Sequence, residues 1–249
     1  MSRQNILVTG ASSGLGLTMA KMFAAKGRNL ALCARRLDRL EELKDEISKA
    51  NPNVKVFIRT LDVNDHDQVF EVFSAFAEDL GHIDRVIVNA GMGKGAPLGT
   101  GHFHANRQTA MTNFVSAIAQ CEASLELFRA QNHGHLVTMS SVSAVRGFGK
   151  ALSVYAATKA GVTCLTEGIR IDLLDTPIKV TTIHPGFIRS EINERVKKVP
   201  FMVDTDVGTR AIINAIEKEG ASYYVPAWPW ALVARIMKVL PLSLLAKAS

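Results

Sequence analysis

Short, almost unbroken apolar runs alternate along this chain with longer segments of helical period. The runs are rich in Val, Ile and Leu, which is typical of strands that are buried on both faces of a sheet. The expected strands are Asn5–Thr9, Asn29–Ala34, Val54–Thr60, Arg85–Asn89, His135–Ser140, Lys179–His184 and Ser222–Val225. The expected helices are Gly14–Lys26, Leu37–Ala50, Gln68–Asp79, Asn106–Ala130, Ser153–Leu174 and Asp206–Glu219.

This alternation indicates βαβ units and a doubly wound parallel sheet, the Rossmann fold, with helices covering both faces in three layers, α/β/α. The 249 residues are 47% hydrophobic, enough for a large buried core. No linker, repeat or low-complexity stretch divides the sequence. We therefore expect residues 1–249 to form a single domain.

The net charge of +6 is concentrated in two places. Residues 26–39 carry five Lys or Arg and one acid, and residues 220–249 carry three cations and no acid. A nucleic-acid-binding protein would spread its cations along a broad stripe, so no nucleic-acid partner is expected. The three cysteines are Cys33, Cys121 and Cys164. They form neither a CxxC motif nor a Cys/His cluster, so we expect no metal site, no disulfide and a cytoplasmic location.

A glycine-rich loop follows the first predicted strand and precedes a helix. Gly10, Gly14 and Gly16 let the backbone approach a pyrophosphate, and the helix start offers free N–H groups. The spacing is GxxxGxG, a loose match to the usual dinucleotide fingerprint, and a plain βα turn without a ligand is the alternative. The residues expected to bind the cofactor here are Gly10, Ser12, Ser13, Gly14, Leu15 and Gly16.

The second predicted strand ends in Arg35 and Arg36, and no carboxylate appears before Asp38. An acid at this place would bind the ribose hydroxyl of NAD, whereas arginine suits the 2′-phosphate of NADP. The alternative is a solvated pair of surface arginines. We expect NADP(H) to be the cofactor.

Two further turns follow strands at the same predicted edge. Asp62 and Val63 come after the third strand, where the carboxylate is placed to accept a hydrogen bond from an adenine amino group. Asn89, Ala90 and Gly91 end the fourth strand, where small residues leave room for a cofactor. Alternatively, Asp62 is a helix cap and Asn89 a turn former.

Tyr155 and Lys159 lie one helical turn apart and share a face. An ammonium group close to a tyrosine stabilises the phenolate and lowers its pKa, which makes the pair a sensible acid/base unit for carbonyl chemistry. The fifth strand leads to hydroxyl groups just before this helix, and by spacing alone Ser140, Ser141 and Ser143 all compete to bind the substrate oxygen.

Asn113 is an unusual polar residue within the apolar stretch of the long helix Asn106–Ala130. It either bonds to backbone or holds a water molecule in a proton relay.

Together these motifs resemble the short-chain dehydrogenase/reductase family over nearly the whole chain. The matching residues are Thr9, Gly10, Gly14, Gly16, Asp62, Asn89, Gly91, Asn113, Ser141, Tyr155, Lys159, Pro185 and Gly186. The resemblance implies an NAD(P)-dependent oxidoreductase in which Asn113, Ser141, Tyr155 and Lys159 are catalytic, and in which Lys159 also holds the nicotinamide ribose. It further implies cofactor contacts at Pro185, Gly186, Ile188 and Ser190.

Two departures from the family pattern stand out. Ser141 precedes Tyr155 by fourteen residues, one more than the family commonly shows, which places an extra residue in the loop Val145–Leu152 and keeps Ser143 as a second candidate. Ser190 stands where the family often has threonine.

The resemblance places substrate selection in residues 187–202, which read as a lid with an apolar underside. We therefore expect a moderately hydrophobic ketone, aldehyde or alcohol as substrate, and a homodimer or homotetramer. Residues 226–249 form an apolar tail, in which 228–245 combine two tryptophans with sparse cations. Packing on an interface or pocket is favoured over weak contact with a membrane surface. The alternatives are a peripheral membrane reductase of lipid-like substrates and a non-catalytic nucleotide-binding scaffold.

Overall fold

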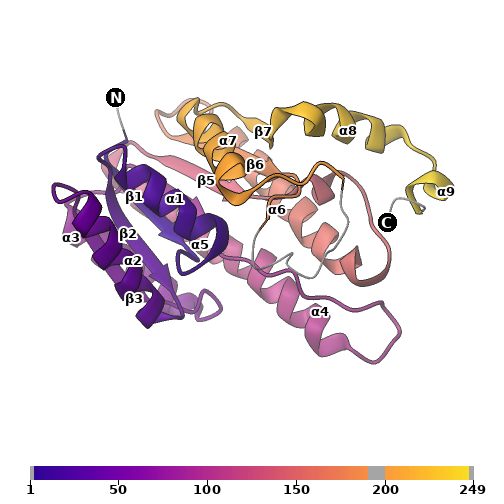
Figure 1. Cartoon of the computed structure of the whole chain (residues 1–249), viewed down its shortest axis with the longest axis horizontal. Helices are drawn as coiled ribbons and strands as arrows, with labels where there is room; N and C mark the ends of the chain where they lie inside the picture. The colour runs from indigo at the N-terminus through magenta and orange to yellow at the C-terminus, as the bar shows by residue number, and fades with distance from the viewer. Residues whose placement is uncertain (1–2, 190–199, 247–249) are drawn as a thin grey trace.

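Seven parallel strands form one sheet in the order β3-β2-β1-β4-β5-β6-β7 (Figure 1). The computed structural model describes residues 3–189 and 200–246 of the chain. The strands are β1 (Asn5–Thr9), β2 (Asn29–Ala34), β3 (Val56–Thr60), β4 (Arg85–Val88), β5 (His135–Met139), β6 (Lys179–Pro185) and β7 (Ser222–Val225). The predicted doubly wound sheet is confirmed. Strand β3 begins two residues later than predicted, because the N–H of Val54 bonds to the carbonyl of Asn51 in a turn.

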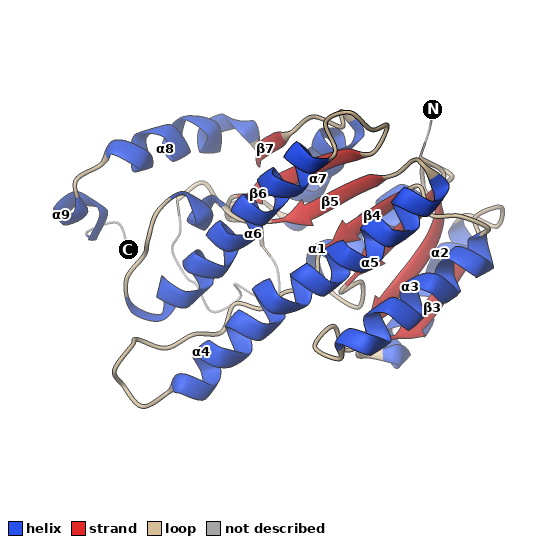
Figure 2. Cartoon of the chain, turned by 180° about the vertical axis from the view of Figure 1, so that it is seen from behind, coloured by secondary structure: helices blue, strands red, loops and turns tan. Residues whose placement is uncertain are grey.

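Helices cover both faces of this sheet and form the outer layers (Figure 2). They are α1 (Gly14–Ala24), α2 (Leu37–Ala50), α3 (His66–Leu80), α4 (Phe103–Ala110), α5 (Ser116–Gln131), α6 (Ser153–Asp172), α7 (Thr205–Glu217), α8 (Ala227–Val239) and α9 (Leu242–Leu245). Helix α3 shows why such bounds arise. The Asp65 carboxylate caps its start by accepting from the N–H of Gln68, and Gly81 ends it in the left-handed conformation with φ of 81°.

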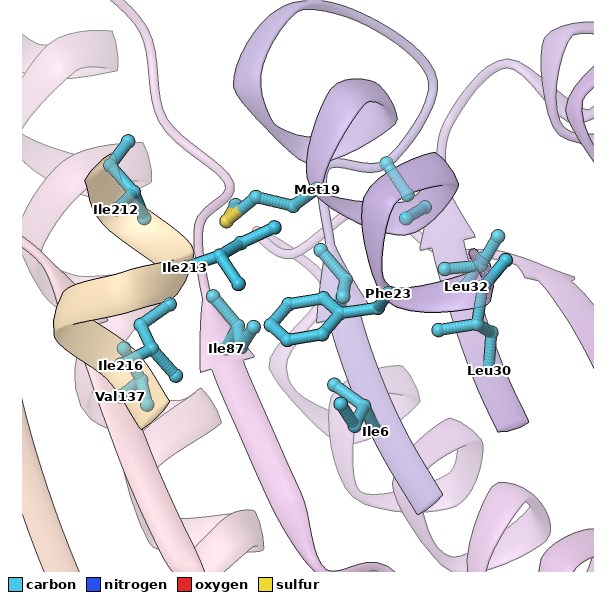
Figure 3. Close-up of a cluster of buried hydrophobic side chains, with 14 of the residues drawn as sticks. Ile6, Met19, Phe23, Leu30, Leu32, Ile87, Val137, Ile212, Ile213 and Ile216 are labelled. Carbon is cyan, nitrogen blue, oxygen red and sulfur yellow. The ribbon is translucent and has the colours of Figure 1, made fainter. Parts of the chain in front are cut away.

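Alternate residues of each strand feed two separate hydrophobic cores. Ile6 and Val8 of β1 face one side, where they meet α1, α2 and α7, whereas Leu7 faces α3, α5 and α6. Figure 3 shows the first core, with Phe23 of α1 opposite Ile213 of α7. Because both faces are covered, the central strands β1, β4 and β5 are fully buried, whereas the edge strands β3 and β7 are partly exposed.

The predicted helix Asn106–Ala130 is wrong as one continuous element. It starts earlier, at Phe103, and a π-helical turn over Met111–Val115 separates α4 from α5. The carbonyl of Met111 accepts from the backbone N–H of Ser116, five residues on, and also from the Ser116 hydroxyl at 3.0 Å. This local widening rotates the helix face that carries Asn113, a common feature of functional sites.

The apolar tail forms α8, which starts beside β7, and α9, which lies beyond the far end of α8 (Figure 1). Trp230 and Ala234 of α8 are buried, while Leu232, Ile236 and Val239 are exposed. Across residues 3–189 and 200–246, none of the helices is both long and apolar enough to cross a membrane.

Candidate active site

The turns that follow β1, β4, β5 and β6 meet at the carboxyl edge of the sheet. Strand β1 lies between β2 and β4, so the chain leaves the centre after β1, builds one half of the sheet and returns at β4. Such a switch opens a crevice between the two turns, which is where open α/β sheets bind ligands. The residues predicted to bind a cofactor therefore lie on neighbouring turns, although they are far apart in sequence.

The glycine loop after β1 is built for close backbone approach. Gly10 and Gly14 have φ of +66° and +54°, a conformation that favours glycine. A Cβ at Gly16 would overlap the carbonyl oxygen of Gly10, and a Cβ at Gly10 would lie 2.9 Å from the Cα of Ala90. Helix α1 starts at Gly14 with no side-chain cap and no acid in its first turn, so its N–H groups face the crevice unneutralised.

Thr9 and Asn89 fasten the two turns of the crevice together. The Thr9 hydroxyl accepts from the backbone N–H groups of Asn89 and Ala90, both at 3.1 Å. In return, the Asn89 amide donates to the Thr9 carbonyl at 2.9 Å. Asn89 is therefore a turn former, the alternative that its sequence position left open, and it fixes the width of the crevice.

The predicted arginine pair lies beside the glycine loop. The Arg36 guanidinium donates from two nitrogens to the Ser12 hydroxyl, each at 3.3 Å, so its charge is held at the loop that is expected to bind phosphate. Arg35 is exposed. A hollow beside the loop is lined by Ser12, Ser13 and Gly14 and by charged residues of α2, namely Arg39, Glu42 and Glu46. Arg39 is paired with Glu42 at 3.1 Å.

Asp62 and Val63 follow β3 near the start of α5. The Asp62 carboxylate accepts from the backbone N–H of Asn64 at 3.0 Å and from the Asn64 amide at 2.9 Å. Asn64 in turn accepts from the Ser116 hydroxyl at 3.0 Å, just after the π turn. The carboxylate at the expected adenine position is thus held in place by its own turn, while Val63 is buried.

Ser141, Tyr155 and Lys159 come together where β5 ends and α6 begins. The Ser141 side chain lies close enough to the Tyr155 phenol to lower its pKa. The Lys159 ammonium donates to the carbonyl of Met139 at 2.8 Å and faces Gly91, whose added Cβ would lie 3.6 Å away. The sheet therefore places a hydroxyl, a phenol and an ammonium along one wall of the crevice.

The three candidate serines are distinguished by their bonds. The Ser140 hydroxyl donates to the carbonyl of Lys159 at 2.9 Å and is bonded to Thr163, so it holds the helix against the strand. Ser143 donates its backbone N–H to the Ser141 hydroxyl at 3.1 Å. Among the three, Ser141 is the one whose side chain acts on the pKa of Tyr155.

The pKa values of this cluster are shifted mainly by burial. Burial lowers the pKa of Lys159 to about 8, because the ammonium loses its hydration. Burial raises the pKa of Tyr155, and the Ser141 side chain works in the opposite direction. The expected lowering by Lys159 is not found, since its ammonium is bonded to the Met139 carbonyl rather than to the phenol.

The side chain of Asn113, in the π turn, is hydrogen-bonded to the loop after β4. Its carbonyl oxygen accepts from the N–H of Met92 and its amide donates to the carbonyl of Met92, both at 2.8 Å. Asn113 is 1% exposed, and a Cβ at Gly91 would lie 3.3 Å from its oxygen. Of the two interpretations left open for Asn113, backbone bonding is the one that the structure displays.

The turn after β6 carries the last predicted cofactor residues. Pro185 ends the strand, Gly186 follows it and Ile188 is buried, whereas Ser190 lies outside the described residues. The indole of Trp230 in α8 lies directly against Gly186, where any Cβ would overlap it. Trp230 was not among the predicted site residues, because the residues around it give no sign of which part of the tail contacts this turn.

An aromatic cluster covers this end of the crevice. The Trp230 ring lies 5.5 Å from the Phe187 ring and 6.0 Å from the Phe201 ring, both in edge-to-face geometry. Phe187 and Phe201 belong to the predicted lid at 187–202, of which residues 190–199 lie outside the described part of the chain.

Comparisons with known proteins agree with the geometry. A sequence profile of the short chain dehydrogenases matches residues 4–200. An uncharacterised oxidoreductase of Mycobacterium tuberculosis strain H37Rv is 50% identical over 241 residues, which span 97% of this chain and 95% of the relative.

Two solved structures share the fold. A short chain dehydrogenase/reductase of Burkholderia phymatum in complex with NAD has a TM-score of 0.83 at 21% identity, covering 95% of this chain and 94% of its own. An alcohol dehydrogenase of Thermococcus sibiricus, complexed with 5-hydroxy-NADP, has a TM-score of 0.79 at 24% identity, covering 89% and 94%. One neighbour thus holds NAD and the other an NADP derivative.

Proposed function

The chain belongs to the short-chain dehydrogenase family, and we propose that it is an NADP(H)-dependent oxidoreductase that interconverts a ketone or aldehyde and an alcohol. The observation that carries this proposal is the grouping of Ser141, Tyr155 and the Lys159 ammonium at the mouth of a glycine-lined crevice. In this proposal residues 1–249 form one catalytic domain. Members of this family use nicotinamide cofactors and act on small molecules.

The cradle of the crevice fits a dinucleotide. A pyrophosphate binds where the backbone is accessible and its N–H groups are free to donate. Gly10, Gly14 and Gly16 provide such a backbone at the start of α1. Asn89, Ala90 and Gly91 leave the opposite wall equally bare. When bound, the nicotinamide supplies or accepts the hydride.

The preference for NADP(H) over NAD(H) rests on Arg35 and Arg36. A guanidinium binds a charged 2′-phosphate through forked hydrogen bonds. The Arg36 guanidinium is already hydrogen-bonded to Ser12 in the glycine loop. The first carboxylate after this strand is Asp38, within the first turn of α2. No acid therefore stands at the tip of β2 to take the ribose hydroxyl in place of the phosphate.

In the proposed mechanism Tyr155 holds and moves the proton. During reduction its hydroxyl donates a proton to the substrate oxygen, and during oxidation the phenolate takes it back. The Ser141 hydroxyl bonds to the same oxygen as charge builds on it. Lys159 leaves the Met139 carbonyl to approach the phenol and the cofactor ribose, and there it stabilises the phenolate. Asn113 holds the loop after β4 in position and supports the water chain to solvent.

The substrate is proposed to be moderately hydrophobic. The end of the crevice is covered by Phe187, Phe201 and Trp230, which offer aromatic surface and few hydrogen-bonding groups. An apolar group beside the reacting carbonyl would pack against these rings.

A homo-oligomer, dimer or tetramer, is part of the same proposal, since family members are commonly oligomeric. Light scattering measures the state directly. Liposome flotation then tests the alternative of weak membrane contact through residues 228–245. A chain shortened before Trp228 that floats as well as the full chain would exclude the tail as a membrane anchor.

The proposal is tested by following NADPH oxidation over a panel of ketones and aldehydes, and repeating the screen with NADH. We expect turnover of apolar ketones with NADPH and much slower turnover with NADH. A strong NADH preference would overturn the roles of Arg35 and Arg36. Tight NADPH binding without turnover of any carbonyl would favour the scaffold alternative.

A further inference from the structure

Two histidines and one aspartate converge at the amino edge of the sheet, at the opposite end of the strands from the crevice. His82 lies in the turn between α3 and β4, Asp84 immediately precedes β4, and His133 lies in the turn between α5 and β5. The Nε2 of His82 is 3.4 Å from Oδ2 of Asp84, and the Nε2 of His133 is 3.6 Å from Oδ1. One atom from each of the three side chains lies within 4.8 Å of the others.

These separations suit a single small metal ion. Zinc bonds to histidine nitrogen and carboxylate oxygen at about 2.0–2.1 Å, which places tetrahedral ligands roughly 3.3 Å apart. The two histidine–aspartate distances are already close to that value. The remaining approach is available to the imidazoles, because the side chains of His82 and His133 are 47% and 39% exposed.

The carboxylate of Asp84 is held ready for a ligand. It is 11% exposed, and its Oδ2 accepts from the backbone N–H groups of Gln4 and Asn5, both at 2.9 Å. These bonds fix the plane of the carboxylate, while Oδ1 points toward His133. A buried carboxylate with one oxygen directed at an imidazole is the hydrogen-bonded type of ligand that metal sites use.

His133 is oriented by its other nitrogen. Its Nδ1 lies 3.0 Å from the carbonyl oxygen of Gln131, which can only accept, so Nδ1 is the donor and Nε2 is the nitrogen turned toward Asp84. An imidazole with its second nitrogen bonded to a backbone carbonyl is the usual arrangement of a metal-bound histidine.

The backbone that carries the trio is also pinned. The Gln131 amide donates to the carbonyls of Ile83 and His133, at 2.6 and 2.8 Å, and so joins the two turns. The Asn5 amide donates to the carbonyl of His82 at 3.0 Å. The neighbouring cation Arg85 directs its guanidinium away, toward Glu217 and Glu219.

From this geometry we propose that His82, Asp84 and His133 bind a divalent transition-metal ion of the zinc class, with water completing the coordination on the exposed side. Two neutral imidazoles and one carboxylate give a site of net charge −1 and a donor set that such ions prefer over Mg²⁺ or Ca²⁺. The ion cross-links the turns before β4 and β5 and is independent of the crevice. The sequence analysis expected no metal site.

The test uses tag-free full-length protein that has been treated with chelator and desalted. Cobalt(II) is titrated first, because tetrahedral Co²⁺ absorbs visibly, and Zn²⁺ is then added in competition. We expect one equivalent of Co²⁺ to give the tetrahedral spectrum and Zn²⁺ to displace it. Zn²⁺ should also raise the melting temperature, because it binds only the folded protein.

His82→Ala and His133→Ala should each weaken binding by at least about tenfold, since even losing an outer hydrogen-bond partner of a metal ligand costs that much. Asp84→Asn, which keeps an acceptor for Gln4 and Asn5, should do the same. Circular dichroism verifies that each variant is folded. Two results would overturn the proposal: no stoichiometric binding by the parent protein, or unchanged affinity in the folded variants.

The matched control is a second exposed histidine pair. His102 and His104 lie at the start of α4 with their rings 6.1 Å apart. In the part of the chain that the structure describes, His82, Asp84 and His133 are the one group of this composition that can share an ion. The double variant His102→Ala/His104→Ala should therefore bind Co²⁺ and Zn²⁺ as the parent protein does, and a loss of binding there would mean an adventitious histidine pair.

Discussion

The two ends of the same sheet are built in contrasting ways. At the carboxyl edge, glycines leave the backbone bare and the Lys159 ammonium has one protein acceptor, the Met139 carbonyl. At the amino edge, Arg85 is 1% exposed and is bonded to His135 at 2.9 Å and to Glu217 at 2.9 Å. The first end leaves donors available for a ligand, whereas the second satisfies them within the protein.

The closed network at the amino edge joins three strands and the turn before β7. His135 on β5 accepts from Arg85 on β4 and is bonded through its other nitrogen to Thr181 on β6 at 2.8 Å. The Thr181 hydroxyl donates to the carbonyl of Gly220, just before β7. The difference indicates that the amino edge fixes the strands while the carboxyl edge carries chemistry. Variants at the two edges should therefore separate stability from activity.

The largest effect is expected for Tyr155→Phe at the carboxyl edge. Removing the hydroxyl removes the proton donor, so kcat/KM should fall by roughly 10²- to 10⁴-fold, the usual contribution of general acid catalysis. The affinity for NADPH, measured by fluorescence titration, and the urea midpoint should stay close to those of the parent. Full activity of this variant on a good substrate would refute the mechanism.

Next comes Arg85→Met at the amino edge. It leaves Glu217 and Glu219 without their shared cation, and the free energy of unfolding should fall by about 3 kcal/mol, the lower end for buried pairs, because both carboxylates are partly exposed. Urea titration measures the loss, and NADPH affinity of the folded fraction should not change.

The matched control for that variant is Arg59→Met, which breaks a 2.7 Å ion pair with Asp79 at the surface. It should cost less than about 1 kcal/mol. Equal losses in the two variants would remove the distinction between a buried network and an exposed pair.

A smaller effect is expected for Arg36→Ala, which tests the cofactor preference. Losing a charge-assisted bond to phosphate costs about 1.5–3 kcal/mol, so NADPH affinity should drop roughly 10- to 100-fold. NADH affinity should hardly change. The control for a general loss of positive charge is Lys49→Ala. Lys49 lies in the last turn of α2, the helix that starts directly after Arg36. Equal weakening of both cofactors would argue against a 2′-phosphate contact.

The smallest effect is expected in the free energy of unfolding at acidic pH. Burial and the Arg85 charge lower the pKa of His135 from 6.5 to about 3, so the unfolded chain takes up a proton that the folded chain refuses. The contribution of His135 to stability should therefore fall as the pH drops below 6.5, by about 1.4 kcal/mol between pH 7.5 and pH 5.5, and be flat above that range. Burial likewise lowers the pKa of His184 from 6.5 to about 4, so a loss of about the same size should add to it.

A second loss should follow at lower pH. The pKa of Glu219 is lowered from 4.5 to about 2, and although its partial burial opposes this, the hydrogen bond and charge of Arg3 lower it, with help from His135 and Arg85. Its stabilising effect is present above pH 4.5 and disappears toward pH 2. Urea titrations across pH check both steps, and His135→Gln should remove about half of the first, because His184 contributes the remainder. An unchanged slope in that variant would assign the proton to another group.

The local sequence was enough to place the strands and most of the helices. The strands could be placed because a strand buried on both faces must be apolar along its whole length. Each segment carries that signal in its own residues. The π turn at Met111–Val115 could not be foreseen, because it depends on where the side chain of Asn113 meets the loop at Met92. Likewise, Trp230 lies on Gly186 only because β7 brings α8 beside the end of β6.

The sequence by itself determined the fold class, the glycine loop and the order of Ser141, Tyr155 and Lys159, because these depend on residue type and short spacing. Only the tertiary structure decided which serine meets the tyrosine, and that Lys159 is bonded to a carbonyl. It alone brought His82 and Asp84 to His133, since contacts between distant residues depend on which strands become neighbours in the sheet.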